Sequence, residues 1–146
     1  PIQISHERDE RIKRLSGKID RVLVDAPCSG LGTLRRNPDM KWRQSPKSVE
    51  ELRVKQAAIL ESAARLLKPG GRLVYATCSL LELENEDIAG AFTAAHEKDF
   101  KVLPAAEALD KAHAGSPQDL VRGDFLRLWP HKHGTDGFFA AVWERK

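Results

Sequence analysis

Short apolar runs alternate with longer amphipathic stretches along most of the chain. Residues 21–25 form a β-branched apolar run that ends in an acid, and residues 72–77 form a second run of this kind. Each run predicts a buried strand. Ser45-Pro46 is typical of a helix N-cap followed by a first-turn proline, and Pro69-Gly70-Gly71 predicts the end of that helix. Its apolar face is expected to comprise Val49, Leu52, Ile59, Leu60, Ala63, Leu66 and Leu67.

The second half of the chain predicts one more helix and three more strands. The helix is expected from about residue 83 to residue 96, and its inward residues are Ile88, Ala91, Phe92 and Ala95. A strand is expected at 100–103. Two further strands, at 125–130 and 137–143, are expected to pair antiparallel. Residues 104–124 are polar and irregular, which indicates a surface excursion.

This order of elements predicts an α/β fold with a largely parallel sheet. A right-handed crossover places the first two strands side by side or nearly so. Ligands bind such sheets beyond the carboxyl ends of the strands. Cys28 follows the first strand and Cys78 follows the second at this same edge. We therefore expect the two cysteines to converge, although 50 residues separate them in the sequence.

The composition indicates an ordinary globular domain. The chain has 146 residues, of which 41% are hydrophobic and 31% charged. No apolar run approaches the roughly 18 residues of a membrane helix, so no membrane partner is expected. Two cysteines do not make a disulfide scaffold, which favours free thiols in a reducing, cytoplasmic setting.

Positive charge is concentrated in the first third of the chain. Residues 1–47 hold 11 Lys/Arg and 6 Asp/Glu, whereas residues 48–146 hold 13 and 15. Part of the excess surrounds Trp42. Basic residues around an aromatic ring suit an RNA backbone and a stacked base, although the charge alone favours a solvated loop.

The two cysteines and Asp25 are the candidate chemical groups. A thiolate at this edge can attack an electrophilic carbon, whereas a buried thiol elsewhere is usually a packing residue. Asp25 could orient a substrate, carry a proton, or cap the turn at 27–29 through backbone amides. A metal site could in principle use Cys28, Cys78, His131 and His133 as ligands. The spacing of these residues matches no common zinc motif, so no metal site is expected.

Three segments carry a family resemblance. Residues 25–42 contain Asp-Ala-Pro-Cys-Ser-Gly followed by Gly32, Arg35-Arg36, Pro38-Asp39 and Lys41-Trp42. Residues 67–86 contain Leu-Lys-Pro-Gly-Gly, then Tyr-Ala-Thr-Cys-Ser and an acidic stretch from Glu82 to Glu86. Residues 128–139 end in His-Gly-Thr-Asp-Gly-Phe-Phe. Together they resemble the Sun family of RNA cytosine-C5 methyltransferases, and within it the bacterial branch that acts on small-subunit ribosomal RNA.

The resemblance implies a mechanism, a cofactor and a partner. S-adenosylmethionine is the implied cofactor, and ribosomal RNA is the implied partner. Cys78 is the implied nucleophile, which adds to carbon 6 of cytosine so that carbon 5 accepts the methyl group. Cys28 is implied to help release the product, and Asp25 to lie at the cofactor and the cytosine. The target base must leave its stack. The implied RNA backbone contacts are Arg35, Arg36 and Lys41.

The family's glycine-rich loop and the acid that follows it, which hold most of the cofactor, have no counterpart in this sequence. We therefore interpret residues 1–146 as the C-terminal half of a Rossmann-like class I methyltransferase domain, with the cofactor-binding N-terminal half missing. The expected sheet has parallel strands with helices and a terminal antiparallel strand pair. We expect the isolated fragment to be inactive and to self-associate through its truncated sheet edge.

Other functions stay open from the residues alone. DNA cytosine-C5 methyltransferases attack with a Pro-Cys cysteine, which would assign the attack to Cys28. The enzyme could also act on tRNA, and the fragment could be a non-catalytic, basic RNA-binding module. The second cysteine, Cys78, and the aspartate at position 25 favour the RNA enzyme.

Overall fold

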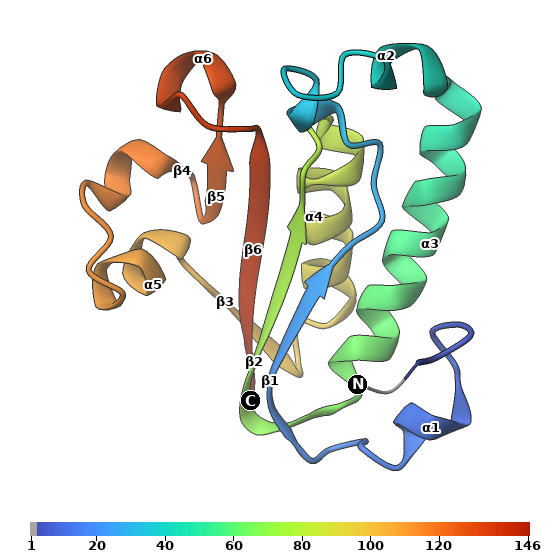
Figure 1. Ribbon diagram of the computed structural model, residues 1–146. Coiled ribbons are helices and arrows are strands. Elements are labelled where there is room, and N and C mark those ends of the chain that lie inside the picture. Colours follow the sequence, from blue (N-terminus) through green and yellow to red (C-terminus); the bar gives the residue numbers. More distant parts are fainter. Residues whose placement is uncertain (1–2) are drawn as a thin grey trace.

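The computed structural model describes residues 3–146, which form one mixed sheet with α3 and α4 packed together on one of its faces (Figure 1). The elements in chain order are α1 (Glu10–Lys13), β1 (Ile19–Asp25), η1 (Leu31–Thr33), α2 (Met40–Arg43), α3 (Pro46–Ala64), β2 (Leu67–Thr77), η2 (Glu82–Glu84), α4 (Glu86–Ala95), β3 (Phe100–Leu103), α5 (Ala105–Lys111), η3 (Pro117–Leu120), β4 (Val121–Arg122), β5 (Phe125–Leu128), α6 (Pro130–His133) and β6 (Phe138–Arg145).

The sheet order is β1-β2-β6-β5-β4, and β3 also pairs with β6. β1 and β2 are parallel neighbours, as expected from their crossover, and Asp25 lies opposite Ala76. The other four pairings between described strands are antiparallel: β6 pairs with β2, β3 and β5, and β5 pairs with β4. The predicted α/β class and the antiparallel pairing of β5 with β6 are confirmed, but the parallel part of the described sheet is a single strand pair.

Helix α3 begins at the predicted cap and ends earlier than predicted. The Ser45 side chain accepts a hydrogen bond from the Ser48 amide, and Ser48 reciprocates to the Ser45 amide. The helix ends at Ala64, so the prediction that it continues to Pro69 was wrong. The Leu66 carbonyl already accepts hydrogen bonds from the start of β1, and Leu67 is paired in the sheet. Leu66 and Leu67 therefore form sheet hydrogen bonds ahead of Pro69-Gly70-Gly71 and do not extend the helix.

Two further predictions need correction. Ile88 and Phe92 face inward in α4 as predicted, but Ala91 and Ala95 are exposed and Ala89 is buried instead. Residues 104–124 are not simply irregular, because they contain α5, η3 and β4. The buried Ala105 donates its amide to the Asp124 carbonyl, which folds the segment back onto the start of β5.

The core lies between the sheet and helices α3 and α4. Leu73 and Tyr75 of β2 and Trp143 of β6 are fully buried and belong to one apolar cluster with Leu60 and Phe92. Burying large apolar side chains is the dominant stabilising contribution for a domain of this size. Among residues 3–146, no helix combines the length and apolar character needed to span a membrane.

Candidate active site

The two cysteines meet at the carboxyl ends of β1 and β2. Because Asp25 lies opposite Ala76 in the parallel pair, the two strands deliver their following loops to the same place. The Sγ atoms of Cys28 and Cys78 lie 3.5 Å apart, and both residues are only partly buried. The convergence predicted from topology is confirmed.

Glycines allow three backbone segments to approach each other behind this pair. The Gly32 amide donates to the Cys78 carbonyl at 2.8 Å, and the Gly137 amide donates to the Gly32 carbonyl at 2.8 Å. A Cβ atom on Gly32 would lie 2.2 Å from the Gly137 carbonyl oxygen and 2.6 Å from that of Cys78. This position therefore requires glycine, and it fixes the Cys78 loop against the loop that carries Cys28.

Glu84 is a fully buried carboxylate that holds both cysteine loops. It accepts hydrogen bonds from the amide of Ser29 at 2.8 Å and from its hydroxyl at 2.5 Å. It also accepts from the hydroxyl of Ser79 at 2.5 Å and from the amide of Gln56 at 3.0 Å. Each of these serines directly follows one of the cysteines. Charge-assisted hydrogen bonds of this kind are about twice as strong as neutral ones, so Glu84 fixes the relative position of the thiols.

The contact between the sulfur atoms moves the pKa values of the two thiols in opposite directions. Cys28 donates its S–H to the sulfur of Cys78, which lowers the pKa of Cys78 to about 7. The same hydrogen bond, together with burial, raises the pKa of Cys28. The charges of Asp25 and Glu84 raise the pKa of Cys78 and so oppose its ionisation. At pH 7 about half of the pairs have therefore lost one proton, and in these Cys78 carries the negative charge.

Among residues 3–146, Asp25 makes no hydrogen bond to the turn after β1, so the structure does not support the alternative in which Asp25 caps this turn. The Ser29 amide in this turn is bound by Glu84 instead. Asp25 is exposed and borders an open hollow of about 510 Å³, which Lys55 and Ile59 of α3 also line. Its carboxylate is therefore free to meet a ligand near the end of β1.

The basic residues predicted to contact RNA lie at the cysteine edge, on the segment that follows Cys28. Arg35 and Arg36 both pair with Asp136, at 3.6 and 3.1 Å, and both remain more than half exposed. Lys41 lies over the ring of Trp42, with its Nζ 4.9 Å from the ring centroid. Trp42 is 81% exposed. The segment thus presents cations and one aromatic face to solvent.

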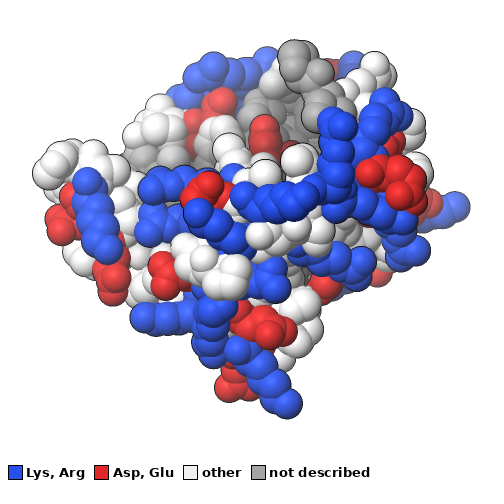
Figure 2. Space-filling view, turned by 90° about the horizontal axis from the view of Figure 1, so that it is seen from below, with Lys and Arg blue, Asp and Glu red and all other residues white. Residues whose placement is uncertain are grey.

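The positive charge of the first third of the chain is divided between two ends of the molecule. Figure 2 views the face near the termini, opposite the cysteine edge, where Lys and Arg are spread with Asp and Glu among them. Residues 8–21, which hold six of the 11 Lys/Arg of residues 1–47, belong to the α1 and β1 end of the chain. Only the other five, within residues 35–47, follow the Cys28 loop.

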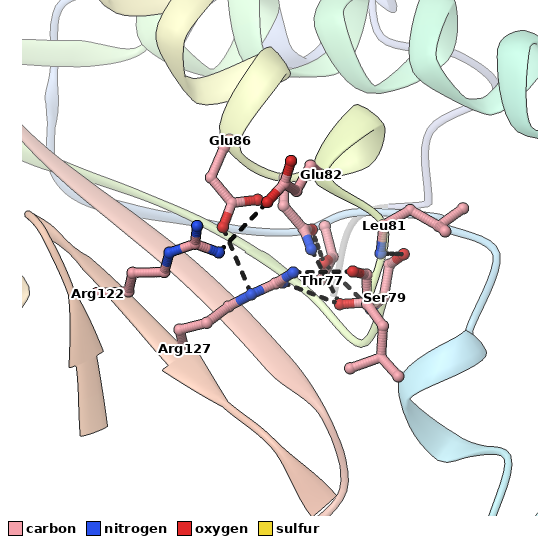
Figure 3. Close-up of polar contacts among 9 residues, drawn as sticks. Thr77, Ser79, Leu81, Glu82, Glu86, Arg122 and Arg127 are labelled. Atoms are coloured by element: carbon pink, nitrogen blue, oxygen red, sulfur yellow. Dashed lines mark hydrogen bonds and ion pairs between the residues drawn. The ribbon is translucent and has the colours of Figure 1, made fainter. Parts of the chain in front are cut away.

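Arg127 and Glu84 are site residues that the sequence analysis missed. Arg127 lies on β5, is 1% exposed, and its guanidinium reaches the Cys78 loop (Figure 3). A lone arginine within the apolar run at 125–129 was the available signal for it. Glu84 lay within the acidic stretch noted at 82–86, but the pattern did not distinguish it from its exposed neighbour Glu82.

His131 and His133 do not join the cysteines. The His133 ring accepts a hydrogen bond from the Trp129 amide and contacts the Asp119 carbonyl. Within residues 3–146, no group of three or more His, Cys, Asp or Glu side chains is arranged to hold a metal ion.

Solved structures resemble this chain closely. The crystal structure of PH0851 is 42% identical and superposes with a TM-score of 0.77 over 88% of this chain and 27% of that one. NSun6 from Pyrococcus horikoshii, solved with SFG, is 28% identical with a TM-score of 0.71 over 99% of this chain and 34% of that one. These similarities support the Rossmann-like methyltransferase fold.

Curated relatives agree with the motifs. A probable ribosomal RNA small subunit methyltransferase B of Synechocystis is 44% identical over 84% of this chain, and one of Bacillus subtilis is 41% identical over 88%. The chain spans only 26% and 28% of these two relatives. The family model for 16S rRNA methyltransferase RsmB/F matches residues 2–144. The family predicted from the two cysteine motifs is thus confirmed, and the chain belongs to the RsmB/F family of 16S rRNA methyltransferases.

Proposed function

We propose that these residues form the C-terminal part of a catalytic domain that methylates carbon 5 of a cytosine in ribosomal RNA. The observation that carries the proposal is the pair of thiols 3.5 Å apart, of which one favours the thiolate and the other the thiol. Carbon 5 of cytosine is a poor nucleophile. Addition of a thiolate to carbon 6 makes it nucleophilic, which is the purpose of covalent catalysis.

Cys78 begins the proposed reaction. Its thiolate forms a bond to carbon 6, and the displaced ring electrons make carbon 5 nucleophilic. S-adenosylmethionine, when bound, would supply the methyl group that carbon 5 takes, and would leave as S-adenosylhomocysteine. The ring is then neutral, and it remains attached to Cys78 through the carbon–sulfur bond.

Cys28 completes the proposed reaction. Once the Cys78 sulfur is bonded to carbon 6, it is no longer a thiolate that accepts a hydrogen bond from the Cys28 S–H. The largest cause of the raised Cys28 pKa is then gone. Cys28 then loses its proton to solvent and, as a thiolate, accepts the proton of carbon 5. The electrons of that C–H bond restore the ring double bond, and the bond to Cys78 breaks to return its thiolate. The pair ends as it began, with one shared proton.

Asp25 is the residue of this chain that we propose to hold the cofactor and the cytosine. Its exposed carboxylate at the end of β1 fits a ligand that offers a cation or N–H donors. The related NSun6 structure contains SFG, an analogue of S-adenosylmethionine, which supports binding of this cofactor class. The remaining cofactor contacts are proposed to come from residues outside these 146, so the isolated chain is proposed to be inactive.

We propose that RNA lies across the segment that follows Cys28. Arg36 and Lys41 are exposed cations suited to phosphate, and Trp42 offers a face for a stacked base. Asp136 neutralises part of the charge of Arg35 and Arg36 and holds them in place. The arrangement favours RNA over a purely electrostatic partner because it combines cations with an exposed indole.

The test is covalent trapping in the complete protein that carries these residues. The parent protein and its Cys78→Ala and Cys28→Ala variants are incubated with substrate RNA and cofactor, then resolved on a denaturing gel. Cys78→Ala should form no adduct and no methylated product. Cys28→Ala should accumulate a protein–RNA adduct. An adduct with Cys78→Ala and none with Cys28→Ala would assign the attack to Cys28, as in the DNA enzymes.

A further inference from the structure

A buried arginine contacts the loop that carries Cys78. Arg127 on β5 donates from Nη2 to the Leu80 carbonyl at 2.8 Å and from Nη1 to the Ser79 carbonyl at 3.4 Å (Figure 3). The Gly32 amide binds the Cys78 carbonyl. The carbonyls of Cys78, Ser79 and Leu80 therefore each accept from a donor far away in the sequence, and the Ser79 carbonyl also accepts from the nearby Asn85 side chain at 3.0 Å.

The surroundings of Arg127 fix its guanidinium in one place. It lies over the ring of Trp129, 4.4 Å from the centroid, and 5.9 Å from that of Phe139. Its Nε lies 3.4 Å from Glu86 at the start of α4. Burial lowers the pKa of Arg127, and the charge of Glu86 opposes this effect. A planar fork between aromatic rings loses little further freedom on binding two carbonyls.

Stability alone is a poor reason for this arrangement. A buried ion pair is often no more stabilising than apolar side chains of similar volume. The neighbours of Arg127 in β5, Leu126 and Leu128, are apolar. An apolar side chain at position 127 would therefore agree with the sequence pattern of this strand. What an apolar side chain cannot supply is the donor for the Leu80 carbonyl and the second donor for the Ser79 carbonyl.

The same hairpin contains a second ion pair that lacks these contacts. Arg122 on β4 pairs with Glu82 at 3.3 Å, and both side chains are more than 60% exposed. Like Arg127, it connects the β4–β5 hairpin to the segment at 82–86. No hydrogen bond from Arg122 to the Cys78 loop is present among the described residues. It therefore provides a matched control for charge, hairpin and partner segment.

We infer that Arg127 is a positioning residue that holds the Cys78 loop so that the Cys78 thiol stays against Cys28. The inference rests on the proposed function, in which Cys78 is the nucleophile. The guanidinium acts through the backbone carbonyls of Ser79 and Leu80, and Glu86 balances its charge. Strand β5 thereby contributes to the position of the nucleophile through Arg127 alone, although the Arg127 side chain contacts the backbone of the Cys78 loop and not the thiols.

The first readout is the acidity of Cys78 in the 146-residue chain. Iodoacetamide labelling of Cys78 is followed against pH by peptide mass spectrometry in the parent chain, Arg127→Met, Arg127→Lys and Arg122→Gln. Loosening the loop weakens the contact with Cys28, so the midpoint should rise by roughly 1 pH unit in Arg127→Met. Arg122→Gln should keep the parent midpoint. The midpoint in Arg127→Lys should lie between those of the parent chain and Arg127→Met, because one ammonium group does not reproduce the two parallel donors of the guanidinium.

The second readout is steady-state methylation by the complete protein. A 1 Å misplacement can cost roughly 100-fold, so kcat should fall roughly 10- to 100-fold in Arg127→Met while KM for RNA changes little. If Arg127→Met does not fold by circular dichroism, Arg127→Lys decides. Parent values of both the midpoint and kcat in a folded Arg127 variant overturn the inference. Loss of methylation or adduct formation in the parent protein would instead overturn the proposed function, whatever the Arg127 variants do.

Discussion

Replacing Cys28 by alanine tests whether the partner thiol makes Cys78 acidic. With a pKa of about 7, roughly half of Cys78 is thiolate at pH 7. Without the S–H donor, the pKa should return at least to the ordinary cysteine value of roughly 8.5, at which about 3% is thiolate at pH 7. Burial and the nearby carboxylates push in the same upward direction.

The loss of thiolate is partly offset by a gain in nucleophilicity. A thiolate whose pKa is about 1.5 units higher reacts about fivefold faster, since the Brønsted slope is about 0.4–0.5. The fall in thiolate fraction is about 15-fold, so the net rate of alkylation at pH 7 should fall only about threefold. The midpoint of the pH profile should rise by the full 1.5 units or so, which makes it the better quantity to measure.

Alkylation of the 146-residue chain provides the assay. Iodoacetamide incorporation at Cys78 is measured by peptide mass spectrometry over a pH range that includes both pKa values. Cys28→Ser is the matched variant, because a hydroxyl still donates to the thiolate and should give a smaller shift. Cys78→Ala shows that the titrating label belongs to this residue. A midpoint that stays near 7 in Cys28→Ala would show that the 3.5 Å contact is not the source of the acidity.

Three other outcomes follow from the structure. Gly32→Ala should lower the free energy of unfolding in urea by more than about 2 kcal/mol, because its Cβ would meet a carbonyl oxygen at 2.2 Å; Gly90→Ala in α4, where nothing lies within 4 Å, should be neutral or stabilising by up to about 1 kcal/mol. In filter binding by the complete protein, Trp42→Ala should weaken RNA binding by about 1–3 kcal/mol without changing its salt dependence. Lys41→Gln should reduce the slope of log affinity against log salt concentration by about 1. Equal effects of the two variants on this slope would contradict the stacking role of Trp42. The isolated chain should self-associate in sedimentation through edge strand β1, where Leu23 is 68% exposed, and Leu23→Lys should weaken this; a parent chain that stays monomeric at all concentrations would refute it.

Local patterns and topology predicted the parts of the site that depend on neighbours in sequence. The Ser45 cap, the strand runs and the turn glycines have signals within a few residues of each other. Two parallel neighbouring strands bring their carboxyl ends together whatever the side chains are. These two facts were sufficient to place Cys28 beside Cys78.

The buried polar residues were beyond the reach of such patterns. Gln56 occupies an inward position of α3 and donates to Glu84, 28 residues away in the sequence. Arg127 contacts carbonyls 47 and 48 residues away. A polar residue at an inward position resembles a surface residue until its partner is known, because burial is tolerated only when hydrogen bonds are satisfied.

The sequence pattern also predicted the wrong buried alanines in α4. Ile88 and Phe92 define the inward face of α4. Their spacing agrees equally with burial of Ala89 on one side of this face and of Ala91 and Ala95 on the other. Burying a single methyl group contributes about 0.8 kcal/mol or less, so alanine spacing does not determine which side turns inward. The packing of Trp143 and Phe100 against Phe92 determines it instead.

The carboxylate of Glu84 tests whether the site is organised for geometry or for charge. Its charge raises the pKa of Cys78, so it opposes the nucleophile that its hydrogen bonds position. In Glu84→Gln, the remaining oxygen can still accept from the Ser29 amide and Gln56, and the new NH₂ can donate to the two serine hydroxyls, which can also act as acceptors. The chain should therefore fold, and the alkylation midpoint of Cys78 should move below about 7, opposite to the Cys28 variant. Glu84→Ala should instead lower the free energy of unfolding by roughly 2–4 kcal/mol, because buried donors lose their acceptor. A raised midpoint in a folded Glu84→Gln chain would refute this reasoning, because it would mean that the net effect of the carboxylate is to make Cys78 more acidic.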